Sequence, residues 1–223
     1  MSIRNLRPDE NDMILVKFTF FSIKDLSRER LNLEFGEVEL YNLTTLNLDK
    51  RQIAQIENST FTNLTKLSQL ILSNNQLKYL SEGIFNGLYN LSSLELNDNK
   101  LTNLSETNFN GLYNLNNLNL ASNQLISLSD KLFSDLDALV FLDLSSNKIV
   151  TLPDNVFNGL ISLSTLDISS NQIFVFYDKV FNGLENLSKI NLIKNNFTEL
   201  PESVFNHLDN LDMGFVLEQI TIY

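Results

Sequence analysis

The sequence predicts a solenoid, a stack of similar coils that each contain one short strand and one returning segment. The first observation is a 24-residue unit that repeats seven times without a gap from Leu43, which is the signature of a stacked-coil protein. The second is that apolar residues hold positions 1, 4, 6, 11, 14, 19 and 22 of every unit. Position 1 is Leu43, Leu67, Leu91, Leu115, Leu139, Leu163 and Leu187 in coils 1 to 7.

The first element of each unit is a strand with the pattern LxxLxL, whose apolar residues in the fifth unit are Leu139, Leu142 and Leu144. The spacing of the seven apolar positions is neither purely helical nor purely alternating. A turn and a returning segment must therefore follow the strand to bring all seven side chains into one interior. When the coils stack, burial of each of these side chains stabilises the fold by about 1.5 to 3 kcal/mol. No unit should be stable alone.

Two further columns of the repeat predict how the coils turn and pack. Position 9 is Asn in six units and Arg51 in the first. A buried Asn amide both donates and accepts, so it can satisfy backbone groups that lose water at a sharp turn. Position 19 is Phe in every unit, which predicts a stacked aromatic spine opposite the strands. Glycines two residues later suit a turn that other residues enter less easily; they are Gly87, Gly111, Gly159 and Gly183.

The combined pattern LxxLxLxxNxLxxLxxxxFxxL, over residues 43–210, resembles the typical 24-residue subfamily of the leucine-rich repeat superfamily. The resemblance implies an α/β fold: a curved solenoid with a parallel β-sheet on its concave face and short helical or irregular segments on its convex face. It also implies that proteins bind to the concave face. Secreted members carry cysteine-bearing caps, but this chain has no Cys, which argues against a receptor ectodomain.

The two ends depart from the repeat. Residues 1–42 have two interpretations: a capping unit whose degenerate strand lies at residues 15–20, or a segment that resembles an F-box. The second resemblance rests on Pro8, the triplet 13–15, the sequence SIKDL at 22–26, and Arg28, Arg30, Leu31 and Phe35. It would make ubiquitin-ligase scaffold subunits partners of the chain. Residues 211–223 form an irregular C-terminal unit that we expect to end on a strand, because LEQITIY restores the LxxIxI pattern.

The inventory of reactive side chains predicts a protein that is not an enzyme. The one histidine, His207, falls at a loop position of the repeat. No His or Cys cluster predicts a zinc site and no glycine-rich loop predicts a phosphate site, so no catalytic residue, metal or cofactor is expected. Position 16 carries an acidic column that we interpret as structural, because a Ser followed by an acid is a helix-start signal and here opens a short convex turn: Glu82, Glu106, Asp130, Asp154, Asp178 and Glu202.

Charge and hydropathy narrow the partner class. With 16 basic against 27 acidic residues and a net charge of −11, the composition predicts neither a nucleic-acid ligand nor an anionic membrane surface. No apolar run reaches the roughly 18 residues of a membrane span, and the polar start does not resemble an ordinary signal peptide. Together with the absence of Cys, these features predict an intracellular location.

A candidate binding surface follows from strand geometry, because positions 3, 5 and 7 point away from the core. Phe141 occupies position 3 where the neighbouring units have Asn and Thr. It stands beside Asp143, with Asp167 and Asn119 in the adjacent coils and Glu95 two coils back. An aromatic residue rimmed by carboxylates has the composition of a protein-binding anchor, although a lone surface aromatic is also common. The predicted function is non-catalytic protein–protein recognition through this surface. The alternative is that the protein is a substrate receptor of a cullin-type ubiquitin ligase and uses the same surface.

Overall fold

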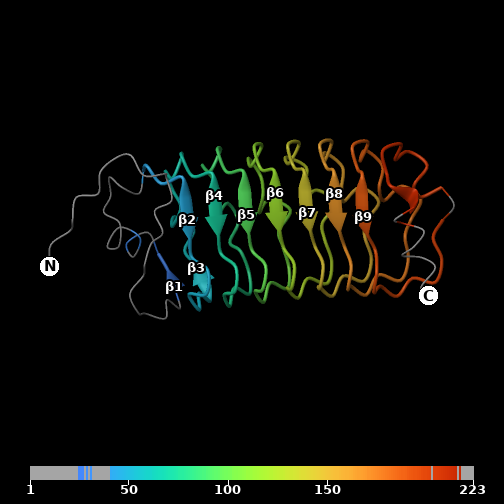
Figure 1. Ribbon diagram of the computed structural model, residues 1–223. Helices are drawn as coiled ribbons and strands as arrows, with labels where there is room; N and C mark the ends of the chain where they lie inside the picture. Colours follow the sequence, from blue (N-terminus) through green and yellow to red (C-terminus); the bar gives the residue numbers. More distant parts are fainter. Residues whose placement is uncertain are drawn as a thin grey trace.

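The computed structural model describes residues 25–27, 29, 31, 41–201, 203–214 and 216. Seven short strands lie side by side in chain order and form one parallel sheet (Figure 1). Neighbouring strands pair with a register of 24 residues, so that Asn117 faces Phe141 and Phe141 faces Thr165. The strands are β2 (Thr45–Asn47), β4 (Gln69–Ile71), β5 (Ser93–Glu95), β6 (Asn117–Asn119), β7 (Phe141–Asp143), β8 (Thr165–Asp167) and β9 (Lys189–Asn191). This arrangement confirms the predicted solenoid.

A second, two-stranded sheet joins the N-terminal segment to coil 1. Here β1 (Asp25–Leu26) pairs in parallel with β3 (Gln55–Ile56), which lies on the returning segment of that coil. Leu31 is fully buried in the common core. Most of the remainder of residues 1–42, including the predicted strand at 15–20 and most of the F-box pattern, lies outside the described residues, as do Glu202 and the strand predicted in LEQITIY.

The core consists of the predicted apolar columns. The Phe side chains at position 19 stack from coil to coil, with ring centroids 6.1 to 6.4 Å apart from Phe61 to Phe181. Hydrogen-bonded strands on the opposite side are only about 4.8 Å apart. Because each coil is wider at the Phe spine than at the sheet, the stack curves with the sheet on its concave face.

The Asn residues at position 9 satisfy the backbone of the turn as predicted. The side-chain nitrogen of Asn75 donates to the carbonyl oxygens of Leu48, in the preceding coil, and of Leu72. Its side-chain oxygen accepts from the backbone N–H groups of Arg51 and Ile53, both at 3.0 Å. Each Asn therefore joins two coils, and the same ladder continues to Asn195.

Position 18 is an additional buried column that the sequence pattern did not predict. Five of its members are Ile, Leu or Val, but Thr60 and Asn108 are equally buried. The side-chain oxygen of Asn108 accepts from the backbone N–H of Ser105 at 2.8 Å. Two polar members thus obscure a core column, and for Asn108 this hydrogen bond satisfies the buried side-chain oxygen.

The convex segments of the described coils are turns, the irregular form among those expected, and the acidic residues at position 16 stand at their start. Hydrogen bonds that span three residues recur there, for example from the N–H of Val156 to the carbonyl of Pro153 and from Leu160 to Phe157. A left-handed residue then redirects the chain. At Gly159 φ is +96°, and an added Cβ would lie 2.9 Å from the Ser134 carbonyl oxygen. The returning segment changes direction too soon for a helix to form.

Candidate functional site

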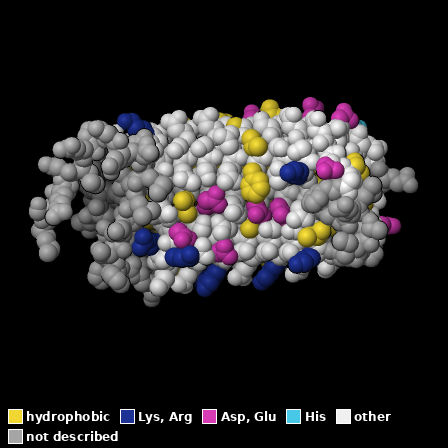
Figure 2. Space-filling view, in the orientation of Figure 1, with side chains coloured by type: hydrophobic (Ala, Val, Ile, Leu, Met, Phe, Trp, Pro, Cys, Tyr) yellow, Lys and Arg dark blue, Asp and Glu magenta, His cyan; other side chains and the backbone are white. Residues whose placement is uncertain are grey.

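The outward side chains of the seven parallel strands form a continuous surface on the concave side, which we call the sheet face. It comprises positions 3, 5 and 7 of each coil. The central residue of each of these strands is buried, and its neighbours are partly exposed or, at Lys189, exposed. Figure 2 views this face and shows hydrophobic and acidic side chains near its centre. The five predicted site residues all lie on it, within the four consecutive strands β5 to β8.

The Asn and Asp side chains at position 5 have a structural role that sequence reasoning missed. Their side-chain oxygens accept from the backbone N–H two residues later: Asn119 from Ala121 at 3.0 Å, Asp143 from Ser145 at 2.8 Å and Asp167 from Ser169 at 2.9 Å. This contact holds the chain as it leaves the strand. Part of the polarity at position 5 therefore reflects folding and is not by itself evidence of binding.

Asp143 and Asp167 occupy adjacent strands and face each other in register. Burial of the Asp143 carboxyl raises its pKa above the ordinary range. Hydrogen bonds from Ser145 oppose this rise, and the negative charge of Asp167 adds to it. The second oxygen of Asp167 accepts from the side chain of Asn191 at 2.9 Å. The pair concentrates negative charge at a partly desolvated point of the sheet face.

The raised pKa of Asp143 predicts a pH-dependent effect of Asp143→Asn. A raised folded-state pKa means that the folded protein binds the proton more tightly, so the wild-type residue lowers stability as pH rises through that pKa. We expect the variant to be more stable than the wild type at pH 7, because Asn removes the partly buried charge and keeps the acceptor for the Ser145 N–H. The difference should shrink as pH falls through the raised pKa of Asp143 toward the ordinary pKa of Asp. Urea unfolding between pH 7 and pH 4 measures it, and Asp154→Asn on the convex side controls for the loss of one charge.

Phe141 is partly buried on the sheet face and has an apolar neighbour that the sequence reasoning did not include. Val140, at position 2, is 44% exposed. Most coils carry Ser or Thr at this position. The hydroxyl groups of Ser68 and Ser92 each donate to the backbone carbonyl oxygen of position 2 in the preceding coil at 3.0 Å. Val140 interrupts that hydroxyl ladder. The departure is visible in the sequence, and it places two adjacent apolar side chains at the start of β7.

Glu95 and Asn119 complete the predicted set on the other side of β7. A side-chain oxygen of Glu95 accepts from the side-chain nitrogen of Asn117 at 3.0 Å. Asn117 in turn pairs in register with Phe141, and Asn119 with Asp143. The structure thus brings the carboxylates of Glu95, Asp143 and Asp167 around the apolar pair Val140 and Phe141 on one surface, which we call the β7 patch.

Other kinds of site find little support among the described residues. No group of three or more His, Cys, Asp or Glu side chains there is arranged to hold a metal ion. His207 is exposed in its loop. In the part of the chain that the structure describes, no helix has the length and apolar character needed to cross a membrane.

Comparison with known proteins agrees with this geometry. A family model described as leucine rich repeat matches residues 41–101, 89–149, 142–196 and 161–213. The chain belongs to the leucine-rich repeat family. A comparison of this leucine-rich repeat chain with curated proteins found no match.

Two similar solved structures show where related coils occur. One is the crystal structure of a TLR13–ssRNA13 complex, with a TM-score of 0.73, 34% identity and coverage of 78% of this chain. The other is the Toll–Spatzle complex from Drosophila, with a TM-score of 0.73, 23% identity and coverage of 85% of this chain. The leucine-rich repeat chain spans 24% of each of those chains. The likeness supports a recognition role, and the expectation of no nucleic-acid ligand gains no support from it.

Proposed function

We propose that the protein is a non-catalytic recognition module that binds another protein through the β7 patch. The observation that carries the proposal is the pair Val140 and Phe141, which break the otherwise polar columns at positions 2 and 3 at the start of β7. Apolar side chains with a polar rim are the common composition of a protein-binding anchor. The carboxylates of Asp143 and Asp167 favour a partner that places Lys or Arg beside an apolar pocket.

The similar structures do not choose the ligand class, because one complex contains an RNA and the other a protein. The side chains of the β7 patch favour protein. Glu95, Asp143 and Asp167 would repel phosphate groups, and Lys189 is the one basic side chain at positions 3, 5 and 7 of the described strands. A cationic protein surface meets this charge pattern better than a nucleic acid does.

The ligase interpretation adds a docking segment to the same recognition surface, and it depends on residues 1–42. Within that segment, β1 pairs with coil 1 and Leu31 is buried in the solenoid core. These contacts support a capping unit. Affinity purification with the full chain as bait distinguishes the two interpretations, since recovery of cullin-type scaffold subunits would favour the ligase receptor.

Phe141→Ala tests the β7 patch once purification has identified a partner. We expect the variant to weaken binding by about 2 kcal/mol or more, because it removes the largest apolar side chain of the patch. The double variant Asp143→Asn with Asp167→Asn should mainly slow association and reduce its salt dependence. Surface plasmon resonance measures both effects.

Tyr113→Ala is the matched control, because Tyr113 is an aromatic side chain that is 58% exposed and lies outside the strands. Its removal should leave affinity unchanged. Unchanged affinity in Phe141→Ala would move the binding site away from the β7 patch. The next candidate would then be the C-terminal end of the sheet, with Lys189, Ile193 and, in the turn that follows β9, Lys194.

A further inference from the structure

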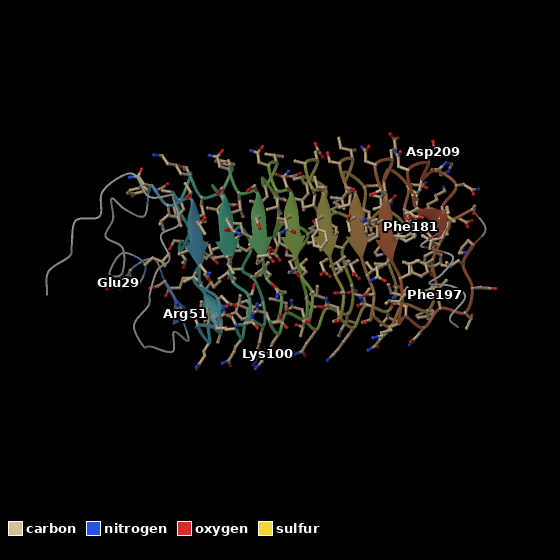
Figure 3. All side chains as sticks on the ribbon, in the orientation of Figure 1. Glu29, Arg51, Lys100, Phe181, Phe197 and Asp209 are labelled. Atoms are coloured by element: carbon tan, nitrogen blue, oxygen red, sulfur yellow. The ribbon has the colours of Figure 1, made fainter. Side chains whose placement is uncertain are left out.

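Positive charge is concentrated along one edge of the solenoid although the net charge is −11. This edge consists of positions 8 to 12, the turn that follows each strand. Figure 2 shows Lys and Arg side chains gathered along it below the strands, and Figure 3 labels Arg51 and Lys100 on it. We call it the basic edge; its cationic residues are Lys50, Arg51, Lys78, Lys100, Lys148 and Lys194.

The basic edge is distinct from the rest of the surface. It contains one acidic residue in seven coils, Asp98. All other positions of the described coils together contain only four basic residues, Lys66, Lys131, Lys179 and Lys189, whereas every Asp and Glu of the coils other than Asp98 lies at those positions. The whole-chain count of 16 basic and 27 acidic residues therefore hides a local reversal of charge.

The backbone of this edge is held in a regular row. The N–H at position 10 donates to the carbonyl of position 11 in the preceding coil, as from Lys100 to Leu77 at 2.8 Å and from Lys148 to Leu125 at 2.9 Å. At position 12, the N–H of Val150 donates to Ile126 at 3.2 Å. Side chains in successive coils therefore lie at a fixed spacing. Because the backbone is already ordered, binding would cost little backbone conformational entropy.

An apolar strip occupies the middle of the row. Ile126 and Phe174 are 52% and 54% exposed, and the partly buried Val150 lies between them in the intervening coil. Lysines flank the strip toward both ends of the solenoid. None of Lys78, Lys100, Lys148 and Lys194 forms an ion pair with a carboxylate in the described part of the chain, whereas Lys50 lies 3.7 Å from Asp49. The edge thus combines cations available to a partner with a central apolar contact.

We propose that the basic edge binds an extended acidic peptide segment that carries apolar residues in its middle. The six coil steps from Lys50 to Lys194 cover about 30 Å at roughly 5 Å per coil, which an extended chain crosses in about ten residues. The apolar strip would contact about three of them. This surface is separate from the β7 patch, so the two can be tested independently.

The composition of the basic edge favours an acidic peptide over a single-stranded nucleic acid or an anionic membrane surface. A single-stranded nucleic acid is held by a series of aromatic platforms on which bases stack, but Ile126 and Val150 are aliphatic and Phe174 stands alone among them. An anionic membrane surface is planar, and it would bring the exposed acids of position 16, such as Asp130 and Asp154, near its own negative charge. A narrow acidic peptide meets the lysines and avoids those carboxylates.

A designed probe tests the proposal with the full chain. The probe is a fluorescein-labelled ten-residue peptide with three Glu at each end and Leu-Phe-Leu-Leu in the middle, measured by fluorescence anisotropy. We expect binding that weakens at high salt, a loss of at least tenfold in affinity for Lys100→Glu with Lys148→Glu, and a loss of at least fivefold for Ile126→Ser with Phe174→Ser. A version of the probe with four central Ser residues should bind at least fivefold more weakly.

Lys131→Glu with Lys179→Glu is the matched control. It makes the same charge change at the same two-coil separation, but at position 17, and it should alter affinity by less than twofold. Phe141→Ala should also leave probe binding unchanged. Circular dichroism verifies folding, and Lys100→Gln with Lys148→Gln replaces the charge-reversal variant if that variant does not fold.

The proposal is overturned if the wild-type chain does not bind the peptide, or if both charge-reversal variants lose affinity equally. It is also overturned if a ten-nucleotide oligouridine, or vesicles of phosphatidylcholine and phosphatidylserine, bind the edge more tightly than the peptide does in a manner that depends on Lys100 and Lys148.

Discussion

Phe133→Ala should lower the free energy of unfolding by about 3 to 5 kcal/mol, the usual cost of truncating a buried aromatic side chain. Phe133 is fully buried, and its ring is stacked between Phe109 at 6.2 Å and Phe157 at 6.4 Å. Truncation removes contacts to both neighbouring coils, because each coil in a solenoid packs only on the next. Urea unfolding monitored by circular dichroism measures the loss.

Phe205→Ala supplies the comparison, since it makes the same substitution in the last coil. Phe205 is partly buried, and its ring stacks on Phe181 at 5.8 Å. We expect a distinctly smaller loss than at Phe133. Equal losses at the two positions would contradict the view that stability is a sum of contacts between nearest neighbours.

The sequence was sufficient to predict the stacking of the coils because the repeat has no insertion over seven units. Each apolar column then points to one place in the core, and Asn at position 9 has a geometric role that few other residues could fill. The same reasoning missed position 18, since Thr60 and Asn108 interrupt its apolar character. Only the structure shows that Asn108 is buried with its oxygen bonded to the Ser105 N–H.

The acidic column at position 16 opens the convex turns, as expected, but the turns do not continue into helices. A Ser or Pro followed by an acid is typical of a helix start, and the first turn does form, as the hydrogen bond from Val156 to Pro153 shows. The chain must nevertheless cross the convex side and re-enter the next strand within a few residues. The left-handed conformation at Gly159 ends the turn early.

The candidate surfaces were predicted less completely than the core. Phe141 was found from its column, but Val140 was missed, and Asp143 was interpreted only as a binding residue although it also accepts the N–H of Ser145. The basic edge was missed because charge was counted over the whole chain. Sorting the charged residues by their position in the repeat would have revealed it, since that register is present in the sequence.

Asn147→Leu should cost at least about 3 kcal/mol, although it replaces a polar residue in the core with an apolar one that has the same number of side-chain heavy atoms. The side-chain nitrogen of Asn147 donates to the carbonyls of Leu120 and Leu144, both at 3.0 Å, and its oxygen accepts from the N–H of Leu125 at 3.1 Å. Leucine leaves these buried backbone groups without a partner, and each such group costs about 1 to 3 kcal/mol. Urea unfolding again measures the loss.

Asn147→Asp and Asn114→Ala separate the hydrogen bonds from the change in volume. Asp keeps the acceptor for the Leu125 N–H but turns an oxygen toward two carbonyl oxygens, so it should destabilise the protein at least as much as Leu does. Asn114, at position 24, is exposed and donates one hydrogen bond to the Tyr89 carbonyl at 2.7 Å. Because water can replace that bond, Asn114→Ala should cost less than about 1 kcal/mol. A loss at Asn147 no larger than the loss at Asn114 would show that packing, and not the amide ladder, holds the turns together.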